Sequence, residues 1–335
     1  MYYEPYKKRR GGARREERER RGGCLPRALW FFVKLLFKLA VLALLLAVVA
    51  YALPPGLFNV EPKADLSLAS GLPDSHVNIL VLGVDADRGA GQRSDTMMIA
   101  SVGYGSLKLT SILRDTMADI DGHGRGKING AYAYGGAELA MHTVNETFQM
   151  NITKYVVVDY LTIARLVDAV GGVDIVISEA EMEQINANNA RYAGSQDIAE
   201  LLGYMPAPVR EYSEDGATPV HLDGLQALGY ARIRKLDSDF MRTSRQRRVV
   251  QAALTALRGR LYDPRVYVRL ADVLFNTMET NMGAVEIVSL GMKALVGGEI
   301  EQMRLPADGT YDDNGSSIFI DEAANAQTLR EFIYG

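Results

Sequence analysis

The chain has 335 residues, of which 48% are hydrophobic and 23% charged, and its formal net charge is −4. This composition is typical of a globular protein with a sizeable core, and it excludes a disordered, collagenous or fibrous chain. The charge is unevenly distributed, because residues 1–27 hold ten Lys and Arg against four Glu. The tail therefore carries +6 and the remainder −10, and an apolar segment separates the two.

That apolar segment covers residues 28–53, with two lysines as its only charges and aromatic residues at positions 30–32. A helix of about 20 apolar residues spans a bilayer, and lysines near its end can snorkel to the headgroups. We expect a cytoplasmic tail at 1–27 and a single uncleaved transmembrane anchor at 28–53, with the C-terminal domain on the extracytoplasmic side of the cell membrane. A signal peptide cleaved at Ala50-Tyr51-Ala52 is the alternative. A buried core helix fits poorly after so basic a leader.

The single cysteine, Cys24, lies in the basic tail. The rest of the chain can therefore form no intrachain disulfide or cysteine metal site, and its four histidines show no metal-ligand spacing. The sequence contains neither a P-loop nor a G-x-S-x-G motif. Thiol chemistry, zinc sites and the serine elbow of hydrolases are thus excluded.

Beyond a proline-containing stalk at residues 54–75, a folded domain is predicted over residues 76–335. Apolar β-branched runs predict strands at 77–84, 96–102, 107–113, 155–159, 173–177 and 302–305. Helical spacing is found at about 136–149, 160–169, 179–190, 222–230, 241–259, 264–277, 284–294 and 322–334. This mixture predicts a single three-layer α/β/α domain with a central mixed sheet. Residues 191–220 are expected to form a surface excursion.

Charged residues stand where predicted strands end. The turn Gly103-Tyr104-Gly105-Ser106 joins strands 96–102 and 107–113 into an antiparallel hairpin, so Asp95 and Arg114-Asp115 meet at one end. If strand 77–84 runs parallel to 107–113, Asp85 reaches the same edge, where open α/β sheets bind ligands. Oxygen ligands without His or Cys favour Mg²⁺ or Mn²⁺. The alternative is that these aspartates only cap turns.

A second group of cations follows at residues 232–242. Arg232 and Arg234 would share one face in an extended segment, because side chains alternate. The two groups combined supply six cations against three carboxylates: Arg93, Arg114, Lys127, Arg232, Arg234 and Arg242 against Asp95, Asp115 and Asp239. This local excess of +3 favours a phosphate ligand, and several guanidinium groups beside a metal favour pyrophosphate. Nucleic acid fits less well, because the domain beyond the anchor is acidic.

Helix 241–259 places two polar residues on its buried side. At about 100° per residue, Arg242 and Gln246 fall on the stripe that later buries Val249. Arg247 and Arg248 fall on the opposite side, where we expect exposure to solvent. A buried arginine must be paired, so Arg242 is expected either to bind an anion or to form a structural salt bridge with Asp239.

Six ordered motifs resemble those of the LytR-CpsA-Psr family. They are Arg93-Ser94-Asp95-Thr96-Met97-Met98, Ser111-Ile112-Leu113-Arg114-Asp115-Thr116, Lys127-Ile128-Asn129-Gly130-Ala131-Tyr132, Val167-Asp168-Ala169-Val170-Gly171-Gly172-Val173-Asp174, His221-Leu222-Asp223-Gly224, and Tyr230-Ala231-Arg232-Ile233-Arg234 with Asp239, Arg242, Arg245 and Gln246. The resemblance covers about residues 77–295, and a short tail with one anchor is usual in the family. The sequence departs at Leu113, where the family often has proline.

The resemblance implies an extracytoplasmic phosphotransferase that moves a glycopolymer from undecaprenyl pyrophosphate to a peptidoglycan hydroxyl through a phosphodiester. The polymer would be a teichoic acid, a capsule polysaccharide or a similar glycan. Carried over by motif, the implied catalytic residues are Asp95, Arg114, Arg232 and Arg234. The implied pyrophosphate-binding residues are Arg93, Arg114, Lys127, Arg232, Arg234, Asp239, Arg242 and Gln246. The implied ligands of Mg²⁺ or Mn²⁺ are Asp95 and Asp115.

Two other functions remain open. Water could replace the glycan, which would make the protein a polyprenyl-pyrophosphate phosphatase, or the protein could be a non-catalytic envelope regulator that attenuates transcription. The 27-residue tail is too short to fold as a DNA-reading module, and electrostatic contact with anionic lipid is its simpler role. A polyprenyl donor also predicts a hydrophobic groove that leads from the arginines into the domain, between sheet and helices.

Overall fold

The structure is a computed structural model that describes residues 65–84, 92–192, 200, 202–205, 207–296, 298 and 300–335. The expected tail and anchor, residues 54–64 of the stalk, and Asp85 lie outside these residues. Within the described ranges, no helix is long and apolar enough to cross a membrane.

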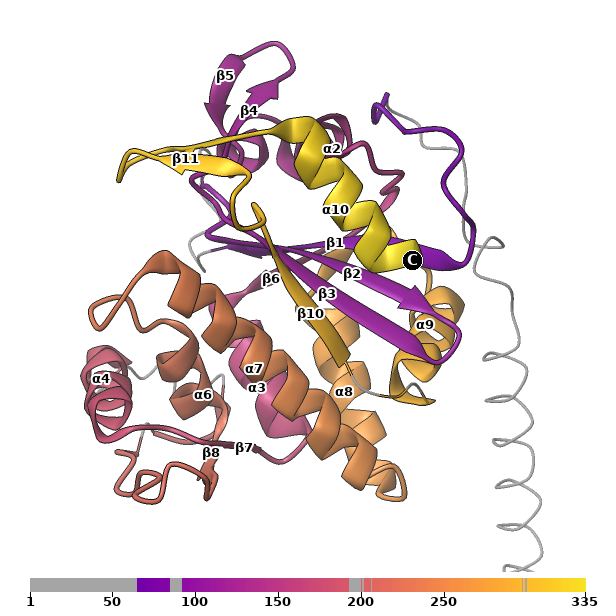
Figure 1. The fold of residues 1–335 in the computed structure, drawn as a ribbon. Helices are drawn as coiled ribbons and strands as arrows, with labels where there is room; N and C mark the ends of the chain where they lie inside the picture. The colour runs from indigo at the N-terminus through magenta and orange to yellow at the C-terminus, as the bar shows by residue number, and fades with distance from the viewer. Residues whose placement is uncertain are drawn as a thin grey trace, which may run out of the picture. The chain divides into compact units, whose positions relative to one another are not determined.

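A six-stranded mixed sheet, in the order β10-β3-β2-β1-β6-β9, forms the centre of the described fold (Figure 1). β2 is antiparallel to β1 and β3, whereas β1 is parallel to β6 and β3 to β10. The strands are β1 (His76–Val84), β2 (Thr96–Gly103), β3 (Ser106–Ile112), β6 (Lys154–Asp159), β9 (Glu279–Thr280) and β10 (Ile300–Leu305). The central mixed sheet and the 96–113 hairpin are thus confirmed. β1, β3, β6 and β10 end at one edge of the sheet, and β2 begins there.

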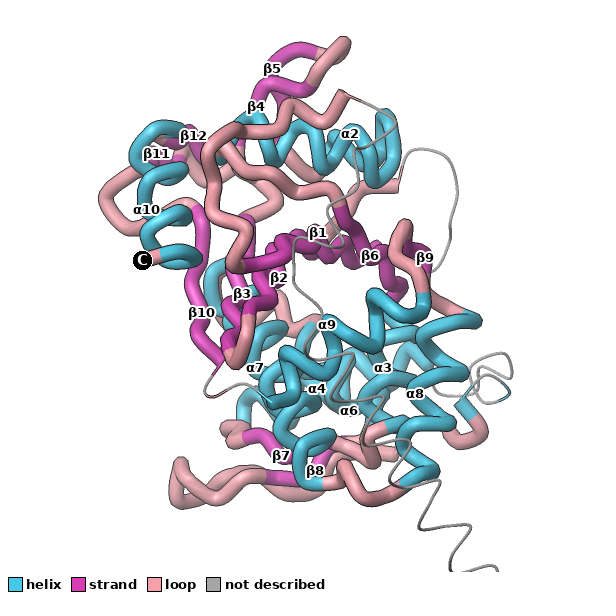
Figure 2. The backbone as a smooth tube through the Cα atoms, turned by 90° about the vertical axis from the view of Figure 1, so that its right-hand side faces the viewer, coloured by secondary structure: helices cyan, strands magenta, loops and turns pink. Residues whose placement is uncertain are grey.

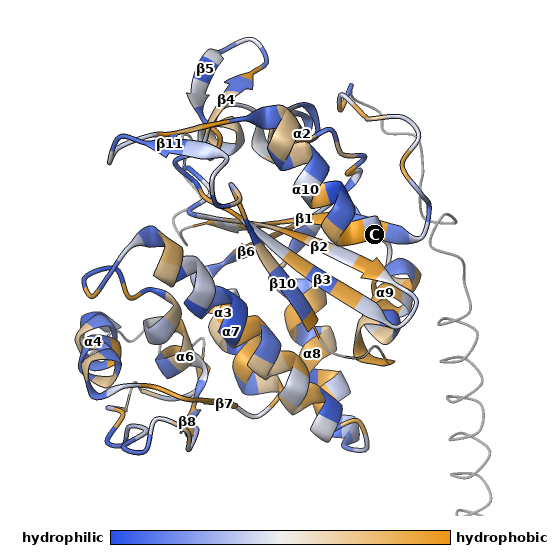
Figure 3. Ribbon diagram, viewed as in Figure 1, coloured by the Kyte–Doolittle hydropathy of each residue, from blue (hydrophilic) through white to orange (hydrophobic). Residues whose placement is uncertain are grey.

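Apolar side chains project from both faces of the central strands. Leu80 and Leu82 of β1 belong to the core cluster on one face, whereas Val77 and Ile79 belong to the cluster on the other. A strand buried on both faces has no polar side, and β1 therefore reads as a nearly continuous apolar run. Figure 3 shows this apolar character along the central strands.

Helices cover both faces of the sheet and give the described fold three layers (Figures 1 and 2). α2 (Gly130–Phe148) and α10 (Glu322–Tyr334) contribute to the core on one face. α3 (Tyr160–Ala169), α7 (Asp239–Gly259) and α9 (Ala284–Val296) contribute to the core on the other. α8 (Pro264–Asn276) packs against α3.

Several short strands lie outside the central sheet. β7 (Val173–Ile175), at the predicted strand 173–177, pairs with β8 (Val220–Leu222) in a separate antiparallel ribbon. Two further hairpins are β4 (Met117–Ile120) with β5 (Gly124–Lys127), and β11 (Tyr311–Asp313) with β12 (Ile318–Ile320). These strands have three or four residues each, too few for an alternating pattern to identify them reliably.

α7 is covered on two sides. α4 (Glu179–Asn189), α6 (Gly224–Ala231) and the β7–β8 ribbon share a core with Val249 and Ala253 of α7. Val250 and Leu254 of the same helix pack toward the central sheet. The helix therefore has two inner faces, which a helical wheel with a single buried stripe does not represent.

The start of α2 differs from the sequence prediction. α2 begins at Gly130 rather than near residue 136, and its helical path is broken at Gly135 and Gly136. Gly136 has a φ of +65°, which residues with a side chain rarely adopt. In the excursion 191–220, Val209 is buried, and both of its backbone hydrogen bonds are made with the Asn186 amide at 2.8 and 2.9 Å. The described part around Val209 is thus fixed to α4.

Candidate functional site: an arginine–aspartate network at the sheet edge

The predicted meeting of Asp95 and Arg114 at the end of the β2–β3 hairpin is confirmed. Asp95 immediately precedes β2, and Arg114 and Asp115 follow β3 at the edge where β1, β6 and β10 also end. The Arg114 Nη1 donates to Asp95 Oδ1 at 2.8 Å. This position agrees with the ligand-binding edge of open α/β sheets.

Further cations reach the same carboxylates from distant parts of the chain. Arg234 Nη2 lies 2.6 Å from the second oxygen of Asp95, so both oxygens of that carboxylate are occupied. Lys127 Nζ lies 2.6 Å from Asp115 Oδ1. The β4–β5 hairpin brings Lys127 there, because Lys127 pairs with Met117, two residues after Asp115. The sequence predicts Lys127 as a site residue but does not predict this hairpin.

Asp239 joins the network through α7. Arg242 Nη2 lies 2.9 Å from its carboxylate, and Arg114 Nε lies 3.9 Å from it. The salt bridge that the sequence left as the alternative for Arg242 is therefore present. We call the connected set the arginine–aspartate network: Asp95, Arg114, Asp115, Lys127, Arg234, Asp239 and Arg242.

Arg242 keeps unused donors despite its salt bridge. The residue is only 2% exposed, yet its Nε and Nη1 are buried without a hydrogen-bond partner. Burial lowers the pKa of Arg242, which neighbouring Arg114 and Arg234 lower further, while Asp239 opposes the shift. A buried donor without a partner costs about 1–3 kcal/mol, more when it is charged. An oxyanion in contact with Nε and Nη1 would remove that cost.

Asp95 stays ionised. Burial alone would raise the pKa of Asp95, but the hydrogen bonds from Arg234 and Arg114 outweigh it and lower the pKa below its usual value. For Arg114, burial is likewise outweighed by Asp95, and the pKa is raised. Asp95 is therefore a weak proton acceptor.

The backbone conformation at Arg232 differs from the predicted extended one. This residue is the C-cap of α6 rather than part of an extended segment, so Arg232 and Arg234 do not alternate as in a strand. The Arg232 guanidinium lies 4.5 Å from the centre of the Tyr160 ring, and Nη1 donates to the Tyr192 hydroxyl. Tyr160 begins α3 directly after β6, so Arg232 stands at the same sheet edge, beside the network.

Two other predicted residues remain apart from the network. Arg93 is exposed and Gln246 is half-buried, and in the described part of the chain neither makes a hydrogen bond or ion pair. Both remain available to a ligand. Their predicted roles stay predictions.

Two further arginines of α7, Arg245 and Arg247, lie outside the network, and Arg247 differs from the prediction. Arg245 is 2% exposed and paired with Glu181 of α4, at 2.8 Å, and with Asp237. It thereby fixes the loop that carries Arg234 to α4. Arg247, expected in solvent, is half-buried against β10 because the second side of α7 faces the sheet.

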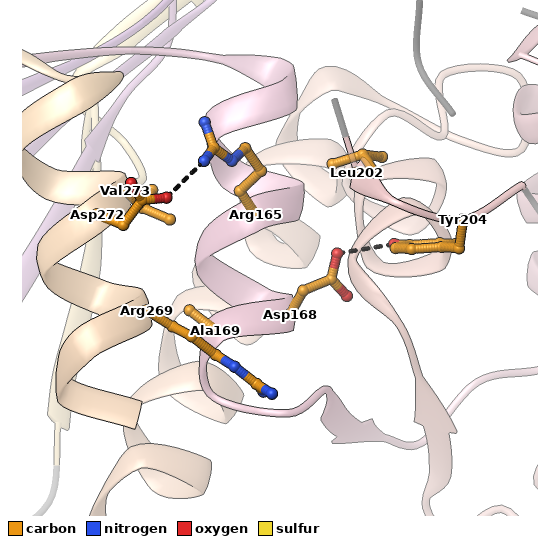
Figure 4. Close-up of a pocket in the computed structure, with 8 residues that line it drawn as sticks. All are labelled: Arg165, Asp168, Ala169, Leu202, Tyr204, Arg269, Asp272 and Val273. Carbon is orange, nitrogen blue, oxygen red and sulfur yellow. Dashed lines mark hydrogen bonds and ion pairs between the residues drawn. The ribbon is translucent and has the colours of Figure 1, made fainter. Parts of the chain in front are cut away.

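Asp168 and Tyr204 line a cavity of about 450 Å³ between α3 and α8 (Figure 4). Asp168 accepts hydrogen bonds from the Tyr204 hydroxyl at 2.8 Å and from the Gly224 backbone N–H at 2.7 Å. A Cβ on Gly224 would lie 2.2 Å from the Ala164 carbonyl oxygen, so only glycine allows this approach of α6 to α3. Asp168 thus fixes the N-terminus of the helix that ends at Arg232.

A divalent cation would have to be held by two carboxylates. Asp95 and Asp115 lie on either side of the Arg114 guanidinium, at 2.8 and 3.5 Å. No group of three or more His, Cys, Asp or Glu suited to a metal occurs in the described ranges. Mg²⁺ is commonly bound by one or two carboxylates together with substrate phosphates. A cation held by these two carboxylates would need phosphate oxygens as further ligands, because each carboxylate oxygen also contacts a cationic side chain.

Fold and site together define an α/β protein with a network of arginine, lysine and aspartate side chains at the carboxyl edge of its central sheet. The model of the LytR_cpsA_psr family matches residues 59–332, and the chain belongs to this family.

Relatives in sequence carry two kinds of name. The chain is 31% identical over 279 residues to the polyisoprenyl-teichoic acid–peptidoglycan teichoic acid transferase TagU of Enterococcus faecalis, covering 80% of this chain and 82% of TagU. It is 29% identical over 273 residues to the regulatory protein MsrR of Staphylococcus aureus, covering 78% of this chain and 75% of MsrR.

Solved structures share the fold. TagT of B. subtilis matches with a TM-score of 0.60 and 21% identity, covering 82% of this chain and 98% of TagT. The family protein YwtF (TagT) with bound octaprenyl pyrophosphate lipid matches with a TM-score of 0.57 and 19% identity, over 82% and 98% of the two chains.

Proposed function

We propose that the protein transfers a glycopolymer from a polyprenyl-pyrophosphate carrier to a hydroxyl of peptidoglycan, forming a phosphodiester. The observation that carries the proposal is Arg242, a buried guanidinium with two unpaired donors inside a network of four cations and three carboxylates. Such a site is built for an oxyanion with several oxygens. The transferase names of relatives support the same activity.

In the proposed reaction, the acceptor hydroxyl attacks the sugar-proximal phosphorus in line with the departing polyprenyl phosphate. The new O–P bond forms as the bridging P–O bond breaks, and the leaving phosphate or solvent takes the hydroxyl proton. Arg114, Arg234 and Arg242 would neutralise the charge on the phosphoryl oxygens, which is the main contribution in phosphoryl transfer. Asp95 orients Arg114 and Arg234 rather than acting as a base, because its pKa is lowered.

We propose that Asp95 and Asp115 hold a Mg²⁺ or Mn²⁺ ion when the pyrophosphate is bound. The ion would add positive charge beside the phosphoryl oxygens. Lys127 would then hold Asp115 in position, since it contacts Oδ1 of that carboxylate at 2.6 Å.

The polyprenyl chain would need an apolar surface, and we propose that it lies along the face of the sheet toward α7 and α9. Val81 and Ala100 lie on the inner strands β1 and β2, yet both remain only half-buried. Met278 and Met282 lie partly buried beside the same core cluster. Incompletely covered apolar residues in the middle of a sheet support a lipid path on this face.

An assay of transfer from a lipid pyrophosphate tests the site. We expect Asp95→Ala and Arg232→Ala to lower turnover, because the first releases two arginines and the second removes a cation at the sheet edge. Arg265→Ala, which breaks an exposed pair with Asp263, is the matched control and should retain wild-type turnover. Unchanged turnover in both site variants would contradict the assignment.

We also propose that the domain lies outside the cytoplasm, anchored by residues 28–53. Cys24 is the only thiol of the chain and lies on the cytoplasmic side in this topology. A membrane-impermeant maleimide should leave the protein unlabelled in intact cells and label it after membrane disruption. Labelling of intact cells would reverse the proposed orientation, and absence of Cys24 from the mature protein would indicate a cleaved signal peptide.

A further inference from the structure

Arg247 is a half-buried cation with an uncharged neighbour as its hydrogen-bond acceptor. Its Nε donates to Gln302 Oε1 at 3.2 Å, and its Nη1 is buried without a partner. Burial lowers the pKa of Arg247, and nearby Arg304 and Arg248 lower it further. Removing a charge from water without supplying a counter-ion is destabilising. Arg247 is therefore destabilising unless a ligand supplies the missing counter-charge and hydrogen-bond acceptor.

Ser111 places a second unpaired group on the same face of the sheet. In the β3–β10 register, Leu109 is opposite Gln302 and Ser111 is opposite Arg304. Because paired residues share a face and Leu109 packs toward α7 and α9, Ser111 and Arg304 face that side too. The Ser111 Oγ is buried without a hydrogen-bond partner.

Arg304 is a second cation on this face of the sheet, and it lies near two aromatic rings and an exposed aspartate. Its guanidinium lies 4.4 Å from the centre of the Phe240 ring and 6.0 Å from that of Tyr311. Its ion-pair partner is Asp308, whose side chain is 88% exposed. Because Asp308 is almost fully solvated, a ligand can displace it from Arg304 at small cost. We call Ser111, Arg247 and Arg304, with the rings of Phe240 and Tyr311, the α7–β10 cluster.

The cluster lies close to the arginine–aspartate network without sharing its residues. Arg247 is five residues beyond Arg242 on α7, or about 7 Å along the helix axis. Ser111 is three residues before Arg114, or about 10 Å along an extended chain. Phe240 directly follows Asp239 of the network. Arg242 and Arg247 point about 140° apart around α7, so the network and the cluster lie on different sides of this helix near its N-terminal end.

We propose that the α7–β10 cluster is a second anion subsite that binds a carboxylate or phosphate carried by one of the glycan substrates. The ligand class rests on the proposed function, whereas the anion subsite rests on the unpaired donors. Arginine forks bind both oxyanions, and the two rings offer apolar faces to a sugar. The same chemistry could come from the peptide stem of the acceptor or from a phosphate repeat of the donor.

Arg247→Gln separates a ligand-binding role from a structural one. Removing an unpaired buried charge should leave the unfolding temperature unchanged or raise it, whereas loss of a structural cation would lower it. Arg248→Gln is the matched control, with the same charge change on the neighbouring exposed residue. Arg247→Lys keeps the charge and should retain part of the binding.

Two probes identify the source of the anion: muramyl dipeptide and an oligo(glycerol phosphate), each titrated against full-length protein in thermal unfolding. We expect at least one probe to stabilise the wild type and Arg248→Gln, with about tenfold weaker apparent affinity for Arg247→Gln. Equal responses of wild type and Arg247→Gln to both probes would overturn the subsite. The titration measures binding and not transfer. If the protein responds to a probe through Arg247 but shows no activity in the separate transfer assay, the proposed function is contradicted and the subsite still stands.

Discussion

Replacing Arg242 by alanine is expected to lower turnover in lipid-pyrophosphate transfer by about 100- to 1000-fold, the range for loss of one donor that stabilises developing charge. The side chain is 2% exposed, and two of its nitrogens have no partner in the folded protein. Those nitrogens are the donors that the phosphoryl oxygens would engage. Arg242→Lys keeps the charge but lacks the planar fork, so it should recover only part of the activity.

Loss of Arg242 should affect the fold much less than the reaction. Asp239, its ion-pair partner, still has Arg114 at 3.9 Å. The variant is therefore expected to unfold near the wild-type temperature, and purified folded protein can be assayed directly. Turnover within a few-fold of wild type would show that the unpaired donors do not meet the reacting phosphate.

Arg245→Ala should have the opposite profile, with a loss of about 3 kcal/mol in the free energy of unfolding. Arg245 is equally buried on the same helix, but its contacts with Glu181 and Asp237 satisfy it. Truncation leaves the carboxylate of Glu181, whose side chain is 13% exposed, without its cation. This loss lies at the lower end of the range for breaking a buried ion pair, because the Asp237 side chain is 28% exposed and can be hydrated.

Denaturant unfolding of Arg245→Ala measures this loss, with Arg265→Ala as the control. The Arg265 side chain is 79% exposed in its pair with Asp263, so its removal should change stability by less than about 0.5 kcal/mol. Two equal losses would mean that burial of Arg245 is energetically unimportant. The contrast between Arg242 and Arg245 thus separates binding from folding within one turn of α7.

The centre of the site could be predicted from the sequence, because the positions of its residues depend on short-range geometry. The four-residue turn at 103–106 forced the β2–β3 hairpin, and the hairpin alone brings Asp95 to Arg114. The burial of Arg242 followed from helical spacing. These inferences need only the period of an element and its direction.

Residues whose environment depends on two packed elements were harder to predict. A helical wheel predicts that Arg247 is exposed because the wheel allows one inner face, whereas α7 lies between the sheet and a second core. Arg232 was placed in an extended segment because no pattern marks how far α6 continues past residue 230. The contact of Arg245 with α4 joins residues 64 positions apart, which local patterns do not encode.

A product balance for the wild-type protein tests the central proposal most directly. Full-length protein would be incubated with a lipid-pyrophosphate-linked glycopolymer, peptidoglycan and Mg²⁺, and muropeptides and lipid products would be quantified by mass spectrometry. We expect polymer joined to muropeptides by a phosphodiester, with one polyprenyl phosphate released for each linkage. Release of polyprenyl phosphate with only unlinked polymer would contradict the transferase and indicate hydrolysis instead.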